Sequence, residues 1–445
     1  MNDKLLIVAE ETSEWIEKYS HNDGDTKWWD VLPGTELAKD EFLLKDTSLY
    51  AGAAGIALFY LRLYEASKNK KYLNNAIGGI NYCIREYGGQ KEFITKGDYL
   101  KGAVIGFLNG PAGGAYVSGL LYRITGDKKY KDFEIRVSED LLATANENQD
   151  KIYWYGEYGI IGEGSLILYL VDLYEKYDDE RYLEAAVKGA RYISSKKEES
   201  PWGGYRWYVM PTDTFPTIRK PGGYFPGFEY GAAGCGYILT KVYEKSHKDE
   251  FLEVAKGAAK YIMAIADEKD GGVLVRYNDT YLKDLYYLGV CQGPVGTSRL
   301  FYALYENTKE EIYKDFLIKL TQGLINSKAP LIHSRGFWRT NCYCCGGAGM
   351  LEHYVNMYRF TKDKKYFDLA NLAAESVIGE STQDEGTRRW YTSWNRHEPN
   401  KSDAYVGLYH GSAGNASALL YLRECANVNE IKLPYLEDAY KTIKF

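Results

Sequence analysis

The stretch YAGAAGIALFYLRLYEASKNKKY, residues 50–72, contains the pattern that decides the fold. A G-x-x-G element begins at Gly52 and opens an apolar stretch, and Tyr72 follows twenty residues later, after a short polar turn. That interval fits a helix of about 15 residues and the start of a second helix, so the unit is a helical hairpin. The element recurs roughly every 60 residues, with first glycines at Gly52, Gly110, Gly159, Gly231, Gly293, Gly346 and Gly411.

A second landmark indicates that these repeats are real and not a result of glycine-rich composition. In the third repeat the aromatic residue, Tyr182, stands slightly later than twenty residues after the first glycine, and the last repeat has Ile431 at that place. The repeats that keep the spacing of twenty do so with Tyr72, Tyr130, Phe251, Tyr313 and Tyr366. We therefore predict seven helical hairpins.

Hairpins of this kind cannot bury their apolar faces alone, so they stack on their neighbours. The seventh repeat lacks a second helix, whereas residues 3–20, DKLLIVAEETSEWIEKYS, form a helical pattern without a partner. We expect this N-terminal helix to complete the seventh hairpin and close a ring. The predicted fold is all-α: a seven-fold α/α toroid, a double ring of helical hairpins, that forms one domain over residues 1–445.

The composition is that of a soluble globular protein. Of the 445 residues 45% are hydrophobic and 26% are charged, which is ample for a large core. The net charge of −6 and the lack of any Lys or Arg run argue against nucleic acid as a partner. No stretch is typical of a secretory signal or a membrane span, so we do not expect an integral membrane protein. Seven cysteines, an odd number, favour reduced thiols and the cytoplasm.

Three loops depart from the helical pattern, and each leads into a glycine element. They start at Pro201, Asp270 and Glu385, and their alternating aromatic residues predict short β-hairpins. Because the elements that follow are equivalent in the ring, we expect the loops to crowd one mouth of the toroid, where substrate would enter.

The residues just before each first glycine become comparable positions around the ring, because the seven helix N-termini should converge on a central cavity. Glycine allows close approach there, and the helix dipoles favour anions. The residues immediately before it are Ala51, Asn109, Tyr158, Tyr230, Gln292, Cys345 and His410. One residue earlier stand Tyr50, Leu108, Glu157, Glu229, Cys291, Cys344 and Tyr409.

Three of these residues predict a metal site. Cys291, Cys344 and Cys345 come from adjacent repeats at matched depth. Three protein ligands that leave a fourth position open are typical of a catalytic zinc, which can bind and deprotonate an incoming thiol. Inert buried cysteines, or a disulfide between Cys344 and Cys345, remain alternatives, and Cys342 is a competing thiol nearby.

The residues resemble the lanthionine synthetase C-like family, whose zinc ligands lie in a C-x-G-x-x-G motif of the fifth repeat and a C-H-G motif of the sixth. The matching strings are CQGPVG from Cys291 to Gly296 and CCG from Cys344 to Gly346, and the resemblance covers essentially the whole chain. It implies a toroid with a central zinc held by Cys291, Cys344 and Cys345, with Cys345 in place of the usual histidine.

The resemblance also implies the reaction. A cysteine thiolate of a dehydrated precursor peptide would add to dehydroalanine or dehydrobutyrine and close a thioether (lanthionine) ring, and an acid would protonate the resulting enolate carbon. The chain has no phosphate-binding loop, so the peptide would come from a separate dehydratase, in a complex that can include an exporter.

The acid of this reaction does not carry over by position. Where the family has a histidine, an aspartate and an arginine, this chain has Tyr230, Tyr155 and Tyr287. His410 takes the pre-glycine place in the seventh repeat, next to the metal arc, and is our candidate proton donor. Glu229 and Glu157 are the alternative proton donors. His410 can also be a structural histidine, with its hydrogen bonds satisfied at the rim of the cavity and no part in catalysis.

Two other functions stay open. A glutathione-binding or glutathione-adding enzyme of the same family would use the same zinc to activate a small thiol. A carbohydrate-active α/α barrel could use Glu157 and Glu229 as its acids, but that function leaves the three ring cysteines without a role. A member of the family that binds zinc without turnover is also consistent with the missing histidine, aspartate and arginine.

Overall fold

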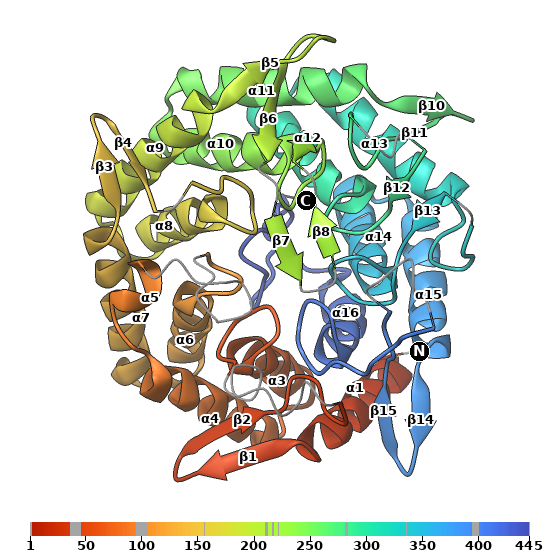
Figure 1. The fold of residues 1–445 in the computed structure, drawn as a ribbon. Helices are drawn as coiled ribbons and strands as arrows, with labels where there is room; N and C mark the ends of the chain where they lie inside the picture. The colour runs from red at the N-terminus through yellow and green to blue at the C-terminus, as the bar shows by residue number, and fades with distance from the viewer. Residues whose placement is uncertain are drawn as a thin grey trace.

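Two concentric rings of helices form the protein (Figure 1). The computed structural model describes residues 2–35, 46–94, 106–154, 156–209, 212–215, 218–220, 222–280, 284–334, 336–393 and 400–444. Within these ranges the inner ring consists of α3 (Ala53–Ser67), α6 (Pro111–Thr125), α8 (Glu163–Tyr177), α10 (Ala232–Ser246), α12 (Pro294–Thr308), α14 (Gly347–Thr361) and α16 (Ser412–Cys425). The outer ring consists of α4 (Lys70–Glu86), α7 (Lys128–Ala143), α9 (Glu180–Ser195), α11 (Asp249–Ala264), α13 (Glu311–Asn326), α15 (Lys364–Gly379) and α1 (Asn2–Glu17). A short helix, α5 (Lys91–Ile94), follows α4.

The helix near the N-terminus closes the ring, as predicted. Helix α1 packs against α16 and α3, so it takes the place of the outer helix that the seventh repeat lacks. The closure also uses ion pairs, since Arg388 binds Glu11 over 2.8 Å and Lys4 binds Glu375 over 2.6 Å. The predicted toroid of helical hairpins is therefore confirmed.

The turn between the two helices of a hairpin follows a local rule. The inner helix ends at a left-handed residue such as Lys68, whose N–H donates to the carbonyl oxygen of Tyr64. An Asn or Asp then caps the outer helix in four of the hairpins, as Asn69 does by accepting the N–H of Lys71, whereas α11 and α13 follow Lys248 and Glu310 and have no side-chain cap. Where it is present, the capping side chain is part of the short polar turn that precedes the aromatic residue of the outer helix, such as Tyr72.

In six of the repeats the second glycine of the element is required by close backbone packing, at Gly55, Gly113, Gly234, Gly296, Gly349 and Gly414. A Cβ atom at Gly296 would collide with the carbonyl oxygen of Val290, and one at Gly414 would collide with that of Leu408. The loop before each inner helix thus lies directly against the first helical turn. This contact holds the pre-glycine residues at one level of the ring.

The third repeat begins three residues later than predicted. Helix α8 starts at Glu163 with Gly162 as its N-cap, so the first glycine of this repeat is Gly162 and not Gly159. Tyr182 then stands twenty residues after the first glycine, as in the other repeats (182 − 162 = 20). Gly159 serves another contact, because a Cβ atom there would collide with the backbone of Glu229 and Tyr230.

Most of the short strands stand at the outer edge of the ring in Figure 1, in the loops that lead from an outer helix to the next inner helix. The second strand of each outer hairpin packs on a neighbouring outer helix, as β11 does on α13 and β15 on α1. The β7–β8 hairpin differs, because it lies across the centre of the ring in Figure 1. The antiparallel hairpins are β1–β2 (Ser20–Asp23, Thr26–Trp29), β3–β4 (Asn146–Asn148, Lys151–Tyr153), β7–β8 (Thr212–Phe215, Ile218–Lys220), β10–β11 (Asp267–Lys269, Gly272–Leu274) and β14–β15 (Thr382–Asp384, Thr387–Arg389). The others are the sheet β5–β6–β9 (Lys197–Glu199, Tyr205–Val209, Gly223–Tyr224) and the parallel pair β12–β13 (Tyr286–Tyr287, Phe337–Trp338).

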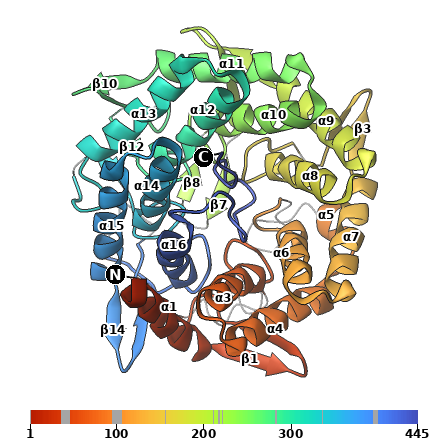
Figure 2. The same ribbon diagram turned by 180° about the vertical axis from the view of Figure 1, so that it is seen from behind.

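Residues 427–444, which we call the central plug, cross the middle of the ring on the side opposite β7–β8 (Figure 2). Inner helices hold the plug through its backbone carbonyls: Arg62 donates to that of Leu433, and Tyr116 to that of Pro434. These hydrogen bonds attach the plug to the inner ring. Among the described residues, no helix combines the length and apolar character needed to span a bilayer.

Candidate metal centre

Backbone hydrogen bonds join the pre-glycine residues of successive repeats around the ring. The N–H of Cys291 donates to the carbonyl oxygen of Cys344 over 3.1 Å, and the N–H of Cys344 donates to that of Tyr409 over 2.8 Å. The same pattern continues from Tyr409 to Tyr50 over 3.0 Å. On the other side, Glu229 donates to Cys291 over 2.6 Å. The predicted equivalence of these positions is therefore confirmed for this part of the ring.

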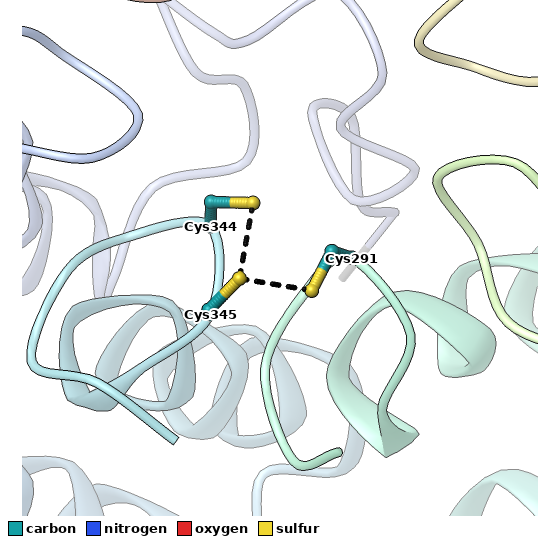
Figure 3. A group of neighbouring side chains, drawn as sticks. All are labelled: Cys291, Cys344 and Cys345. Carbon is teal, nitrogen blue, oxygen red and sulfur yellow. Dashed lines mark hydrogen bonds between the residues drawn. The ribbon is translucent and has the colours of Figure 1, made fainter. Parts of the chain in front are cut away.

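The three predicted ligands converge on one point (Figure 3). The Sγ of Cys345 lies 3.0 Å from that of Cys291 and 3.5 Å from that of Cys344. All three sulfurs lie within 4.8 Å of one another, and the residues are buried. Each is a free thiol, so the structure contains no disulfide between Cys344 and Cys345.

The donor set fits a zinc ion. Thiolates are soft ligands that favour zinc, and a tetrahedral ion with sulfurs at about 2.3 Å holds them about 3.8 Å apart. The observed separations of 3.0 Å and 3.5 Å, with all three sulfurs within 4.8 Å, are close to that spacing. Cys342 lies beside this trio and is not part of it: its sulfur accepts the N–H of Cys345 over 3.5 Å and contacts the Thr340 hydroxyl at 2.9 Å.

Hydrogen bonds among the three sulfurs favour a thiolate at Cys291 and protonated thiols at Cys344 and Cys345. Burial favours the neutral thiol of Cys291, but donation from Cys344 and Cys345 outweighs it and lowers the pKa of Cys291 to about 6. The hydrogen bond to Cys291 raises the pKa of Cys344 well above its usual range. Burial, followed by the hydrogen bond with Cys291, raises the pKa of Cys345 in the same way. A divalent cation would replace these two protons, which is the usual exchange at a thiolate site.

Of the three candidate acids, Glu229 lies at the sulfur cluster. Its Oε1 atom is 4.0 Å from the Sγ of Cys344, and its side chain is half-buried. The backbone hydrogen bonds that join Glu229, Cys291, Cys344, Tyr409 and Tyr50, which we call the belt, fix the position of Glu229 next to Cys291. This carboxylate is therefore close enough to exchange a proton with a thiol bound at the cluster.

His410 is a buried residue of the same rim. Its ring stacks on Tyr50 with centroids 5.2 Å apart and contacts Tyr405 at 4.7 Å. Burial lowers the pKa of His410 to about 4, so the imidazole is neutral at pH 7. A neutral imidazole is a poor proton donor.

Glu157 is not at the ring position that we predicted for it. Because α8 begins at Glu163, the pre-glycine residues of the third repeat are Ile160 and Ile161, and Ile161 donates its N–H to the carbonyl oxygen of Glu229. Glu157 is exposed, and its carbonyl oxygen accepts the N–H of Glu163. Its predicted equivalence with Glu229 is therefore wrong.

The tyrosines that replace the family's polar residues pack together. Tyr230 and Tyr277 join their hydroxyls over 2.9 Å, and Tyr277 stacks on Tyr287 with centroids 4.1 Å apart. Phe225 packs edge-on against both Tyr230 and Tyr277. An aromatic cluster thus stands where polar groups were expected. Tyr155, at the position of the missing aspartate, lies outside the described residues.

Sequence reasoning missed Tyr50 as a residue of this site. Its ring stacks on Tyr409 at 5.2 Å, and its pKa is raised first by burial and then by the charges of Cys344 and Glu229. Interaction with Tyr50 in turn lowers the pKa of Cys344, against the larger effect of Cys291. The signal was present in the sequence, because Tyr50 occupies the same pre-glycine position as Cys291, Cys344 and Glu229.

Comparisons with known proteins agree with this architecture. The model of the family described as lanthionine synthetase C-like protein matches residues 44–433. Glutathione S-transferase LANCL1 of Danio rerio is 20% identical over 405 residues, which cover 88% of this chain and 85% of that protein. The structure of nisin cyclase superimposes with a TM-score of 0.61 at 17% identity, over 85% of this chain and 89% of that one. The fold of nisin cyclase is therefore similar to that of this chain.

Proposed function

Because the chain belongs to the lanthionine synthetase C-like family, we propose that it is a zinc-dependent lanthipeptide cyclase. It adds cysteine thiolates of a dehydrated precursor peptide to dehydroalanine or dehydrobutyrine and closes thioether rings. The observation that carries this proposal is the convergence of three buried sulfurs, from two adjacent repeats, within 4.8 Å. The similarity in fold to nisin cyclase, whose name gives a cyclase activity, supports it.

Cys291, Cys344 and Cys345 would hold the zinc through their three sulfurs and leave one position for the substrate. When bound there, zinc supplies a Lewis acid that favours the thiolate form of the incoming cysteine at neutral pH. The belt of backbone hydrogen bonds keeps the loops of Cys291 and Cys344 in register, so the protein orients the sulfurs before substrate arrives.

The proton of the substrate thiol needs a carrier, and we assign this role to Glu229. The sulfur attacks the β-carbon of the dehydro residue, and the electron pair of the double bond moves toward the neighbouring carbonyl to form an enolate. The α-carbon then takes up a proton, so the net reaction adds S–H across the double bond. A carboxylate 4.0 Å from Cys344 can accept the thiol proton and return it to that carbon.

His410 is the weaker candidate for this step. Burial lowers the pKa of His410 to about 4, so the neutral imidazole predominates at pH 7. We propose that it supports the ring of Tyr50 by stacking. Glu157 is not proposed as the acid, because it is exposed and lies outside the ring of pre-glycine positions.

A third thiolate in place of the family's histidine changes the charge of the site. Three protein thiolates and a substrate thiolate carry more negative charge than zinc offsets, so the bound sulfur is more electron-rich. We therefore propose a more reactive and less discriminating nucleophile than a site with two cysteines and a histidine.

The experiment that tests the function uses a dehydrated precursor peptide with and without the zinc-loaded protein. Formation of thioether rings, detected as protection of the cysteines from alkylation at unchanged mass, supports the proposal. A peptide that keeps all its free thiols contradicts it. The sequence predicts a cytoplasmic enzyme that works after a separate dehydratase and beside an exporter, so neighbouring genes that encode them, with a short Ser/Thr/Cys-rich precursor, also support the proposal.

A second candidate follows from the relative in Danio rerio, whose name gives a glutathione S-transferase. Glutathione carries a thiol, so the same three sulfurs and Glu229 would activate it for addition to a dehydro residue. The same incubation separates the two functions when glutathione is present, because a glutathione adduct raises the peptide mass and ring closure leaves it unchanged. A carbohydrate hydrolase is not supported, since it leaves the three sulfurs without a role.

A further inference from the structure

The central plug lies directly against the loop that carries two of the cysteines. Tyr435 of the plug stacks on Tyr343 with ring centroids 4.2 Å apart and planes 18° apart. Tyr343 immediately precedes Cys344, and both tyrosines are buried. The plug thus touches the residue next to a proposed ligand.

A second contact reaches the neighbouring loop. The hydroxyl of Tyr409 donates to Oε1 of Glu437 in the plug over 2.8 Å. The carbonyl oxygen of Tyr409 is the acceptor for the N–H of Cys344. Glu437 therefore holds the residue whose backbone fixes Cys344.

A buried arginine joins these two contacts. Arg299 of α12 donates to the Tyr343 hydroxyl over 2.8 Å, and its Nη1 lies 3.5 Å from Oε1 of Glu437. Tyr435 also packs edge-on against Tyr409 at 5.2 Å. A buried ion pair is seldom a large source of stability, but it can fix one arrangement of its neighbours.

We propose that the central plug positions the loop that carries Cys344 and Cys345, and that Tyr435 and Glu437 are its positioning residues. The part of this inference that concerns a bound metal rests on the proposed function, whereas the part that concerns the thiols does not. Outer groups of this kind orient ligands without touching the metal, and their loss typically weakens metal binding by about 10- to 100-fold.

The chain offers a matched control within the same plug. Tyr440 packs on Tyr302 of α12 with ring centroids 4.1 Å apart and planes tilted by 32°, and it is as buried as Tyr435. Arg359 holds the carbonyl oxygen of Tyr440 over 2.8 Å. A Tyr440→Leu variant therefore loses an equivalent aromatic pair in the plug, but the contact it loses is to α12 and not to a cysteine loop.

The experiment compares the full chain as wild type, Tyr435→Leu, Glu437→Gln and Tyr440→Leu. Each protein is loaded with Co²⁺, and the thiolate–cobalt absorption bands and the rate of cobalt loss to a chelator are measured. The metal-free proteins are then alkylated with iodoacetamide, and mass spectrometry follows the rate at each cysteine. Melting temperatures report the loss of stability separately.

We expect altered bands and cobalt loss about 10- to 100-fold faster in Tyr435→Leu and Glu437→Gln, together with faster alkylation of Cys344 and Cys345. Tyr440→Leu should melt earlier but keep the wild-type spectrum and rates. The inference is overturned if the first two variants keep wild-type rates, or if Tyr440→Leu changes them equally. Should Tyr435→Leu fail to fold, Glu437→Gln decides, because it keeps the shape of the side chain. If wild-type protein binds no cobalt, the proposed function fails, and alkylation still decides the role of the plug.

Discussion

The backbone N–H of Cys291 donates to the carbonyl oxygen of Cys344 over 3.1 Å. Two proposed ligands from successive repeats are thus held by the same bond that links the repeats themselves. Because similar bonds continue to Tyr409 and Tyr50, the geometry of the sulfur cluster follows from the closure of the ring. The backbone hydrogen bonds that join the repeats therefore also hold the cysteines in place.

A Cys345→His substitution should restore the ligand type usual in the family and lower the reactivity of the bound sulfur. Three thiolates at the site make the substrate sulfur more electron-rich than two thiolates and an imidazole do. We expect the zinc-loaded variant to add a model thiol to a dehydroalanine ester more slowly than wild type. Second-order rates at equal zinc occupancy measure this, and a variant that reacts as fast as wild type argues against the charge effect.

Replacement of Glu229 by Gln should slow ring closure without loss of the metal. A positioned acid–base group typically contributes about 100- to 10,000-fold to the rate, and Gln keeps the shape while it removes the proton carrier. Single-turnover rates with dehydrated peptide, at equal zinc content, test this step.

The matched control is His410→Gln, which we expect to change the same rate by less than about 10-fold, since a neutral imidazole contributes little acid catalysis. If His410→Gln abolishes closure and Glu229→Gln does not, the proton carrier is His410.

A Tyr50→Phe substitution removes the hydroxyl that interacts with Cys344 and keeps the ring that stacks on Tyr409 and His410. We expect zinc affinity to fall about 10-fold, at the low end of outer-group effects, with an unchanged melting temperature of the metal-free protein. Competition with a chromophoric chelator measures the affinity. A variant with wild-type affinity would show that the hydroxyl plays no part in holding the site.

The buried His353 should make the protein less stable in mild acid. Burial lowers its pKa to about 3 in the folded protein, whereas the unfolded chain binds a proton near pH 6.5. The neutral His353 gives its full contribution to stability above pH 6.5, and this contribution is lost as the pH falls toward 3. At pH 5 the loss amounts to about 2 kcal/mol of unfolding free energy. Urea unfolding at pH 7 and pH 5 checks this, and His353→Gln should reduce the difference by that amount. An equal pH effect in the variant would assign the acid sensitivity to other groups.

The ring could be predicted because its determinants are local and repeated. In six of the repeats the second glycine meets the same steric need, as at Gly296 and Gly414, where the preceding loop leaves no room for a Cβ atom. The helical pattern of α1 has no partner within its own repeat, and the seventh repeat lacks an outer helix, so their pairing could be predicted. Cys291 and Cys344 could be aligned for the same reason, since equivalent places in the repeat become neighbours in space.

The third repeat shows where this reasoning fails. Gly159 and Gly162 are three residues apart, so the spacing alone allows either end of the pair to cap the helix. The late position of Tyr182 was the signal that Gly162 caps α8. Choosing Gly159 placed Glu157 in the ring, where the structure has Ile160 and Ile161.

The support beneath the cysteines could not be predicted from the sequence. Tyr435 and Glu437 reach Tyr343 and Tyr409 from a segment with no repeat pattern, and their contacts depend on how the segment crosses the completed ring. The sequence places Tyr50 at an equivalent position in the repeat, but nothing in it distinguishes this tyrosine from the many others or predicts its contact with Cys344.

The metal content of the purified protein tests the central claim most directly. Circular dichroism first confirms that wild type and the variants Cys291→Ala, Cys344→Ala and Cys345→Ala are folded. Elemental analysis should then find stoichiometric zinc in wild type and a loss of nearly all of it in every variant. Wild-type protein that holds no stoichiometric zinc after reconstitution, or variants that keep it, would contradict the proposal that these three sulfurs bind the catalytic ion.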